Sequence, residues 1–277
     1  MPVIKIGQVN WNWPKDFLLI AGPCVIETPS LCLRIAEKAA AIARKAGVPY
    51  VFKASFDKAN RSSHGSFRGH GLDSGLEVLQ MVKNKLGVPV TTDVHEVAQI
   101  PIVAEVVDLL QIPAFLCRQT DLLIAAGASG QPVNVKKGQF MAPWEMANVV
   151  QKIRSQKNKN VILTERGTTF GYNRLVNDMT GIPQMQSLGV PVIFDATHST
   201  QLPGGLGHAT GGQREYVTIL ASSATAAGVN GLFVEVHPHP DKSPSDAASI
   251  YPLNKLDALL RRCTAIREAI RKNKTTA

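Results

Sequence analysis

Short apolar runs alternate with longer amphipathic segments along almost the whole chain. Eight of these runs are nearly continuous in Val, Ile, Leu and Phe, which is typical of parallel strands that are buried on both faces. The strands that we expect are Phe17–Ala21, Tyr50–Lys53, Val90–Asp93, Leu109–Ile112, Val133–Lys136, Val161–Thr164, Val192–Asp195 and Leu232–Glu235.

The segments between these runs have apolar residues at helical spacing. Two of them begin with Thr28-Pro29 and Ala142-Pro143, which place Pro in the first helical turn, where its missing N–H is tolerated. Gly47 and Gly87 stand where a glycine ends a helix. The helices that we expect span residues 30–46, 74–86, 96–106, 120–126, 143–154, 182–188, 214–227 and 253–272.

A strand followed by a helix, repeated eight times, predicts an α/β protein with the (β/α)8 architecture, a TIM barrel. The length of 277 residues suits a single barrel, and no linker or low-complexity segment interrupts it, so we expect one domain over residues 1–277. A doubly wound open sheet is the alternative. Such sheets usually have fewer strands and a GxGxxG turn after the first, which is absent after Leu19-Ile20.

Residues 1–16 precede the first expected strand. In this segment Ile4 and Ile6 flank Lys5, and Gly7 offers a turn before Val9. This short alternation of apolar and polar residues predicts a β-hairpin. We expect the hairpin to cap the bottom of the barrel, at the N-terminal ends of the strands.

The net charge of +9, from 30 Lys+Arg against 21 Asp+Glu, favours anionic partners. Nucleic acid is not expected, because aromatics make up 6% of the chain and no basic stripe has interleaved Phe or Tyr. No membrane association is expected either, since there is no signal peptide and no apolar run of transmembrane length. Four cysteines without CxxC spacing argue against a disulfide framework and for the reducing cytoplasm.

In a TIM barrel the active site lies at the C-terminal ends of the strands. Every expected strand here ends in polar or ionisable side chains: Cys24 with Glu27; Lys53 with Lys58, Asn60 and Arg61; Asp93 with His95; Gln111 with Arg118; Lys136 with Lys137; Arg166; Asp195 with His198 and Gln201; Glu235 with His237 and Asp246. The cations Lys53, Lys136 and Arg166 come from three strands and predict a small, highly anionic ligand such as a phosphorylated carboxylate. Some of these cations can instead form structural salt bridges with neighbouring carboxylates.

The loop after the second strand is dense in cations and hydroxyls. Lys58, Arg61 and Ser62 suit phosphate, because Lys is a point charge and Arg a planar fork. The alternative is a solvated basic loop. A later segment, residues 204–212, is rich in glycine, and it is either a flexible connection or a lid that closes over the site.

A second group comes from the first, seventh and eighth strand ends, which are neighbours in a closed barrel: Cys24, His198, Glu235 and Asp246. A sulfur, an imidazole and two carboxylates suit a first-row divalent cation. Each residue alone can have a structural role, since a free Cys is usually a small buried hydrophobe. The competing ligands are His208, His237 and His239.

These residues together resemble the family of 3-deoxy-D-manno-octulosonate 8-phosphate synthases (KDO8P synthases), over essentially the whole chain from about Phe17 onward. The motifs that carry the resemblance include Ala21-Gly22-Pro23-Cys24, the run from Lys53 to Ser63, Gln111-Ile112-Pro113-Ala114-Phe115, Asn134-Val135-Lys136-Lys137-Gly138, Thr164-Glu165-Arg166-Gly167 and Asp195-Ala196-Thr197-His198-Ser199.

The resemblance implies a transferase, 3-deoxy-8-phosphooctulonate synthase. It condenses phosphoenolpyruvate (PEP) with D-arabinose 5-phosphate and water to give KDO8P and inorganic phosphate, for lipopolysaccharide biosynthesis in the bacterial cytosol. By the same resemblance PEP is held by Lys53, Lys136, Arg166 and Gln111, and the rim residues Asp93 and Gln201 also belong to the substrate site. The sugar is held by Lys58 and Asn60, and its phosphate by Arg61 and Ser62, with Arg118 completing the site from the same or a neighbouring subunit of a homotetramer.

The family has metal-dependent and metal-independent members, and the independent ones resemble this chain but have Asn at the position of Cys24. The chain therefore resembles the metal-dependent branch. That implies a divalent ion (Mn, Fe, Co or Zn) on Cys24, His198, Glu235 and Asp246. Catalytic roles fall to Lys58, Asn60, His198 and Asp246, and the proton-transfer residue is left open among Lys58, His198 and Asp246.

Two other functions are considered. The related DAHP synthases act on erythrose 4-phosphate and have Lys-Pro-Arg-Thr where this chain has Lys58-Ala59-Asn60-Arg61. A non-catalytic phosphosugar-binding barrel is the second, and it predicts missing charges at some strand ends, whereas all eight are charged or polar here.

Overall fold

The computed structural model describes residues 3–61, 63–205 and 210–274. Eight parallel strands form its centre: β3 (Leu18–Gly22), β4 (Tyr50–Lys53), β5 (Val90–Asp93), β6 (Leu109–Ile112), β7 (Val133–Lys136), β8 (Val161–Glu165), β11 (Val192–Asp195) and β14 (Gly231–His237). Each strand pairs with the next along the chain, and β14 also pairs with β3, which closes the barrel. The predicted TIM barrel is confirmed.

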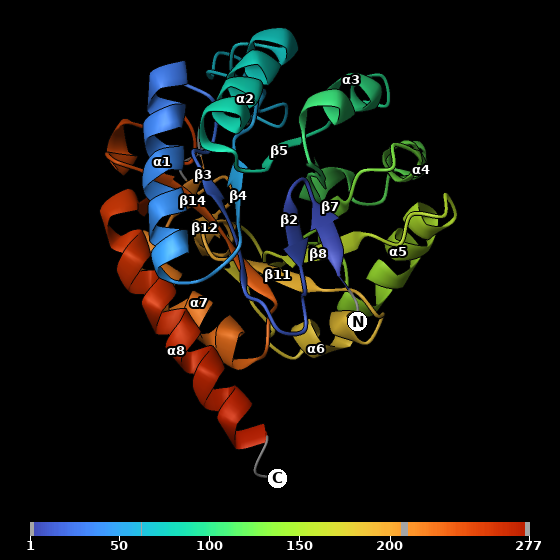
Figure 1. Ribbon diagram of the computed structural model, residues 1–277, viewed down its shortest axis with the longest axis vertical. Helices are drawn as coiled ribbons and strands as arrows, with labels where there is room; N and C mark the ends of the chain where they lie inside the picture. The colour runs from blue at the N-terminus through green and yellow to red at the C-terminus, as the bar shows by residue number, and fades with distance from the viewer. Residues whose placement is uncertain (1–2, 62, 206–209, 275–277) are drawn as a thin grey trace.

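The helices lie outside the ring of strands (Figure 1). They are α1 (Pro29–Lys45), α2 (Leu72–Leu86), α3 (Gln99–Val106), α4 (Thr120–Ala128), α5 (Met146–Arg154), α6 (Gly181–Gln186), α7 (Val217–Ala226) and α8 (Leu256–Lys274). The short 3-10 helices η2 (Pro143–Glu145), η4 (Arg214–Tyr216) and η6 (Leu253–Lys255) precede α5, α7 and α8, where the sequence had predicted continuous helices. Three others follow strands at the rim: η1 (Ala114–Leu116), η3 (His198–Thr200) and η5 (Pro240–Lys242).

The helix ends follow the capping residues. Thr28 accepts a hydrogen bond from the Leu31 backbone N–H at 3.2 Å and starts α1. Gly87 ends α2 with a left-handed φ of 61°. The helix expected from residue 96 begins instead at Gln99. The side-chain oxygen of Gln99 accepts hydrogen bonds from the backbone N–H groups of His95 and Glu96, which lie before the helix.

The predicted N-terminal hairpin is present as β1 (Ile4–Ile6) and β2 (Val9–Trp11), with Ile4 opposite Trp11. Its buried side chains join the inner core of the barrel, and the barrel residues of that core stand mostly at the beginnings of strands: Leu18, Ile20, Val51, Leu109, Ile162, Ile193 and Phe233. The hairpin therefore closes the N-terminal end of the barrel. A larger outer core lies between the strands and the helices.

Phe233 lies at the upper limit of the inner core. Its ring is fully buried, and the Nζ of Lys136 lies 3.6 Å from the ring centroid. The ring lies between the apolar lower part of the barrel and the lysines at the C-terminal ends of the strands. We call it the floor of the site.

Short ladders occupy the loops at the C-terminal rim: β9 (Thr168–Thr169) with β10 (Leu175–Val176), β12 (Gln201–Leu202) with β13 (Gly211–Gly212), and β15 (Tyr251–Pro252) beside β14. Runs this short have no periodicity, so the sequence did not predict them. The β12–β13 ladder is the base of the glycine-rich segment. The centre of that segment, including His208, lies outside the described residues.

Two further findings concern the described part of the chain. All four cysteines are free and buried. None of its helices combines the length and the apolar character that crossing a membrane requires.

Candidate active site

Two adjoining pockets open at the C-terminal ends of the strands. The first is lined by most of the sequence-predicted residues, including Lys53, Lys58, Asn60, Asp93, Lys136, Arg166, His198 and Glu235. The second shares four of these residues and extends to Arg61, Gln201 and Asp246. The barrel therefore brings together residues that are spread over more than two thirds of the sequence.

Two of the three predicted ligand cations are buried and paired. The Lys53 ammonium donates to Glu235 Oε1 at 2.6 Å and to the Cys24 carbonyl at 2.9 Å. Lys136 donates to Asp195 Oδ2 at 2.6 Å. Burial lowers the pKa of Lys136, and Asp195 only partly opposes this effect. The expectation that some cations form salt bridges is confirmed for both lysines, which also line the first pocket.

Arg166 has donors to spare. Its Nη2 donates to Gln201 Oε1 at 2.9 Å. Its Nε and Nη1 are buried and have no hydrogen-bond partner in the described part of the chain. Because a buried donor without an acceptor is costly, these groups indicate a place for an anion beside Arg166.

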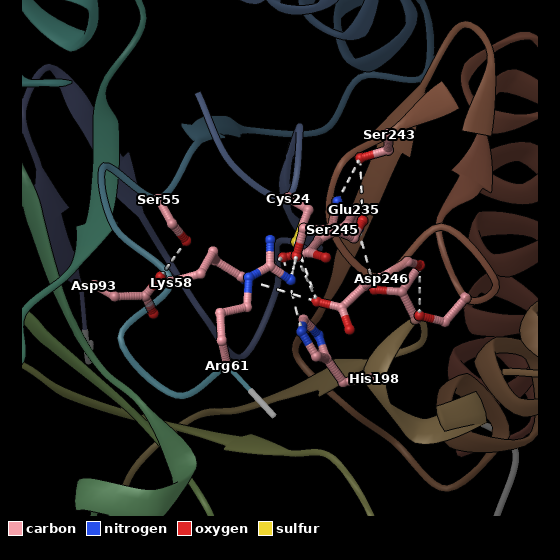
Figure 2. Close-up of polar contacts among 12 residues, drawn as sticks. Cys24, Ser55, Lys58, Arg61, Asp93, His198, Glu235, Ser243, Ser245 and Asp246 are labelled. Carbon is pink, nitrogen blue, oxygen red and sulfur yellow. Dashed lines mark hydrogen bonds and ion pairs between the residues drawn. The ribbon is translucent and has the colours of Figure 1, made fainter. Parts of the chain in front are cut away.

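Three of the four predicted metal ligands converge. The ligand atoms of Cys24, Glu235 and Asp246 lie within 4.8 Å of one another, and Figure 2 shows the three side chains gathered at one point. A thiol sulfur with two carboxylates is a donor set that first-row divalent cations accept, so these residues fit a metal. The fourth, His198, lies beside the group, with Nε2 at 3.7 Å from Glu235 Oε1.

His198 is oriented by Asp195. The carboxylate lies 2.7 Å from Nδ1 and accepts the His198 backbone N–H at 2.9 Å. This contact directs Nε2 toward Glu235 and is typical of the carboxylates that orient metal-binding imidazoles. Burial alone would raise the pKa of Asp195, but His198 and Lys136 outweigh it and lower the pKa well below its usual range.

Asp246 is held in an unusual backbone conformation. Its φ of 50° is left-handed, which is uncommon for a residue other than glycine. Its Oδ1 accepts a hydrogen bond from Gln201 at 2.8 Å, and its Oδ2 lies 3.2 Å from the Cys24 sulfur. Strained conformations of this kind gather at functional sites.

Lys58 stands between the two pockets. Its ammonium lies 3.9 Å from both Glu235 and Asp246. Burial would lower the pKa of Lys58, but the acidic groups around it, which include the carboxylates of Glu235 and Asp246, raise the pKa well above its usual value. Lys58 is therefore a charged donor at the centre of the site.

A chain of buried hydrogen bonds runs across five neighbouring strand ends. Asp93 accepts from Ser55 and, at 2.6 Å, from Gln111. Gln111 accepts from Asn134 at 3.0 Å, and Asn134 accepts from Thr164 at 2.7 Å. The amide of Gln111, expected to contact substrate, is thus engaged inside the barrel wall and does not line either pocket.

The remaining predicted residues lie apart or outside the description. Arg118 lines a different pocket, between α4 and α5. Ser62 is outside the described residues. The competing ligand His237 has Nε2 at 3.3 Å from Glu27 Oε1, and His239 donates its backbone N–H to His237 Nδ1.

Sequence reasoning missed three contributors. Ser55 supports Asp93, Asp57 lines the first pocket, and Ser245 contacts the thiol of Cys24. Of these three residues only Ser55 could have been found from the sequence, because it lies just beyond the end of an expected strand. The contacts of Ser245 join parts of the chain that are far apart, so spacing does not reveal them.

The unpartnered donors of Arg166 and the group of Cys24, Glu235 and Asp246 can hold a small polyanion beside a divalent cation. Burial raises the pKa of the Cys24 thiol well above its usual value. Comparison with known proteins shows the family of the chain. The DAHP synthetase I family matches residues 8–272.

Three similar proteins are each described as a 2-dehydro-3-deoxyphosphooctonate aldolase. The one from Cyanothece sp. is 56% identical over 269 residues, 97% of this chain and 97% of that protein. The one from Trichlorobacter lovleyi is 52% identical over 268 residues, with 97% and 98% covered. The one from Geobacter sulfurreducens is 54% identical over 263 residues, with 95% and 97% covered. The chain therefore belongs to the DAHP synthetase I family and, within it, to the group of the 2-dehydro-3-deoxyphosphooctonate aldolases, which are also called KDO8P synthases.

Proposed function

We propose that this protein condenses PEP with D-arabinose 5-phosphate and water to give KDO8P and inorganic phosphate, a step toward lipopolysaccharide. C3 of PEP attacks the aldehyde carbon of the sugar, water adds at C2, and the hemiketal phosphate loses phosphate by cleavage of the C–O bond. More than 50% identity to 2-dehydro-3-deoxyphosphooctonate aldolases over nearly the full length supports this reaction.

The observation that carries the proposal is the buried cation set in the first pocket. Lys53, Lys136 and Arg166 come from three strand ends, and Arg166 has two donors without a partner in the described chain. PEP has a carboxylate and a phosphate, so it supplies acceptors that a neutral ligand lacks. Asp195 and Glu235 form buried ion pairs with the two lysines.

The sugar belongs on the side of the second pocket. Lys58 and Asn60 line both pockets, so they are suited to the part of the sugar that meets PEP. Arg61 lines the second pocket and is suited to the sugar phosphate. In this arrangement the loop after β4 holds one reactant while Lys53, at the end of the same strand, holds the other.

Cys24, Glu235 and Asp246, together with His198, are the residues that would hold a divalent ion. When bound, such an ion supplies positive charge that polarises a carbonyl oxygen or a water. The protein's own part is to orient His198 through Asp195 and to keep Lys58 protonated beside both carboxylates. Lys58 is then placed to give a proton to the oxygen that forms when the sugar aldehyde is attacked.

The reaction is tested by measuring inorganic phosphate released from PEP with each of two aldoses. We expect turnover with arabinose 5-phosphate and much less with erythrose 4-phosphate. A preference for erythrose 4-phosphate would indicate a DAHP synthase instead. Binding of PEP without phosphate release under any metal condition would favour the non-catalytic barrel.

The PEP site is tested with Arg166→Lys, because Lys cannot make the bidentate contact of a guanidinium. Losing one charge-assisted hydrogen bond of about 1.5–3 kcal/mol predicts a KM for PEP higher by about 10- to 100-fold. Arg174→Lys is the matched control, since Arg174 is exposed at the same loop. Equal effects of the two variants would remove Arg166 from the PEP site.

The metal is tested by chelation and readdition. We expect activity to disappear after chelation and to return with Mn²⁺, Fe²⁺, Co²⁺ or Zn²⁺. Full activity in a verified metal-free preparation contradicts a metal-dependent mechanism. Cys24→Asn should weaken metal affinity, and unchanged affinity would exclude Cys24 from the ligands.

We also propose a homotetramer in which Arg118 serves a neighbouring site. Large aromatic side chains are exposed after three neighbouring strands, among them Trp144 at 67% and Tyr172 at 98%, and exposed apolar patches of this kind mark interfaces. Arg118 lies outside both central pockets of its own chain. Sedimentation measures the oligomer.

The role of Arg118 across subunits can be tested by complementation. Arg118→Ala and Lys136→Ala subunits are each expected to be inactive. Mixed oligomers of the two regain some activity if the residues of one site come from two chains, because some sites then have both wild-type residues. Mixtures that stay inactive would place Arg118 in its own subunit's site or outside the reaction.

A further inference from the structure

The hydroxyl of Ser245 is a junction between two parts of the site. Its oxygen accepts a hydrogen bond from Arg61 Nη1 at 2.8 Å and from the Cys24 thiol at 3.0 Å, and it donates to Asp246 Oδ2 at 3.1 Å. Figure 2 shows Ser245 between these three side chains. Ser245 is buried.

These contacts use the full capacity of the hydroxyl. A serine oxygen has one proton to donate and two lone pairs to accept with. Ser245 therefore cannot take a further partner without giving up one of these three contacts.

Arg61 is also nearly saturated by the protein. Its Nε and Nη2 donate to the Phe67 carbonyl, and Nη2 donates in addition to the Pro244 carbonyl. With the bond to Ser245, four of the five N–H groups of the guanidinium are engaged. A phosphate that takes a bidentate hold on Arg61 has to displace at least one of these contacts.

We propose that Ser245 is a positioning residue that holds Cys24 and Asp246 ready for a divalent cation, and that Arg61 sets the position of Ser245, so that the sugar-phosphate site and the metal site are coupled through one hydroxyl. The identity of the sugar phosphate rests on the proposed function. The hydrogen bonds that link Arg61 through Ser245 to the metal ligands are independent of the proposed function.

Coupling of this kind works in both directions. If occupation of Arg61 by a phosphate changes the affinity for the cation, the cation changes the affinity for the phosphate by the same factor. The protein can then distinguish a complete site from a half-filled one before PEP reacts.

The test is a titration of the full-length protein with Co²⁺, followed by the absorption of the cobalt–thiolate bond, which reports Cys24 without any turnover. Ser245→Ala is expected to weaken Co²⁺ binding by about 10- to 100-fold, as the loss of an outer-shell contact does. Ser243→Ala is the matched control, because the Ser243 hydroxyl donates to the Ser245 carbonyl in the same loop. It is expected to leave the affinity within about threefold, because it touches no ligand atom.

A double-mutant cycle isolates the coupling. Arg61→Ala is expected to change Co²⁺ affinity in the wild-type background and to have no further effect in the Ser245→Ala background. Arabinose 5-phosphate added without PEP should shift the Co²⁺ affinity of the wild type more than that of Ser245→Ala. Ser245→Thr keeps the hydroxyl and should retain most of the affinity, and circular dichroism verifies that each variant is folded.

The inference is overturned if Ser245→Ala binds Co²⁺ as tightly as the wild type, or if Arg61→Ala has the same effect in both backgrounds. An Arg61→Ala variant with wild-type affinity also overturns the coupling. These outcomes are independent of the reaction, since a protein that fails to release phosphate from PEP and arabinose 5-phosphate can still show the cobalt cycle.

Discussion

Replacing Phe233 by leucine tests whether the floor of the site is more than an apolar filler. Leucine keeps the position apolar but has no aromatic face. The Phe233 ring lies 3.6 Å from the ammonium of Lys136 and 5.6 Å from that of Lys53, measured to the ring centroid. Phe194→Leu is the matched control. Phe194 is equally buried, in the outer core, and no cation lies over its ring in the part of the chain that the structure describes.

The size of the difference follows from this geometry. Both substitutions remove the same atoms from a fully buried place, so the loss of apolar burial is largely shared. A cation over an aromatic ring away from water contributes about 2 kcal/mol or more, against about 0.5–1 kcal/mol at an exposed site. We therefore expect Phe233→Leu to lower the free energy of unfolding by about 2 kcal/mol more than Phe194→Leu, roughly a factor of 30 in the ratio of folded to unfolded protein.

Urea unfolding followed by circular dichroism measures this difference, with the midpoint and the m-value compared at one protein concentration. Phosphate release supplies a second readout, since Lys136 loses the ring beneath it and the KM for PEP should rise for Phe233→Leu only. Equal losses of stability in the two variants, with equal KM values, would refute the reasoning. The contact between Lys136 and the ring would then contribute nothing to the free energy of unfolding or to PEP binding.

Three further predictions concern the barrel wall, at Gln111 and Gly22, and the buried carboxylate of Asp195. Gln111→Leu removes the partner of both Asp93 and Asn134 and should lower the free energy of unfolding by about 2–4 kcal/mol in urea, since a stranded buried polar group costs about 1–3 kcal/mol; a loss under about 1 kcal/mol contradicts this. Asp195 has a folded pKa below its unfolded value near 4, so its stabilising effect is present above that pH and declines as the pH falls below it. Asp195→Asn should accordingly be less stable than the wild type at pH 7, with a gap that narrows below about pH 4, and a gap that stays constant in unfolding curves across that range would exclude the linkage. Gly22→Ala would place a Cβ 1.9 Å from the Lys53 carbonyl oxygen and should push β3 away from β4. Thermal unfolding and Co²⁺ affinity both detect this change. A wild-type melting temperature and a wild-type Co²⁺ affinity would contradict the prediction.

The barrel was predictable because its strands are buried on both faces. Such strands need continuous apolar runs, and the expected bounds of Val192–Asp195 and Val133–Lys136 agree with β11 and β7. The rim was not predictable to the same degree. Its two-residue ladders, such as Gln201–Leu202 with Gly211–Gly212, are defined by tertiary contacts and leave no periodic pattern.

The charged residues of the candidate site were predictable from the sequence, but the residues that hold them in position were not. Lys53, Lys136 and Arg166 are recognised from the sequence because a closed barrel sends every strand end to one rim. Ser245 is not, because its role depends on a contact with Cys24, 221 positions away. Gln111 shows the opposite case, in which a polar residue at a strand end serves the wall rather than the pocket.

The buried hydrogen-bond chain has a direction. Thr164 donates to Asn134, Asn134 to Gln111, and Gln111 to Asp93, so every dipole along four neighbouring strands has its positive end turned toward one carboxylate. Reversing any amide would leave two acceptors or two donors face to face, so the orientation of all of them is set together. Burial would raise the pKa of Asp93, but Lys53, Lys58 and Lys136 outweigh it and lower the pKa well below its usual range. Asp93 is therefore a fixed counter-ion: the wall sets its position, and the lysines at the strand ends keep it charged.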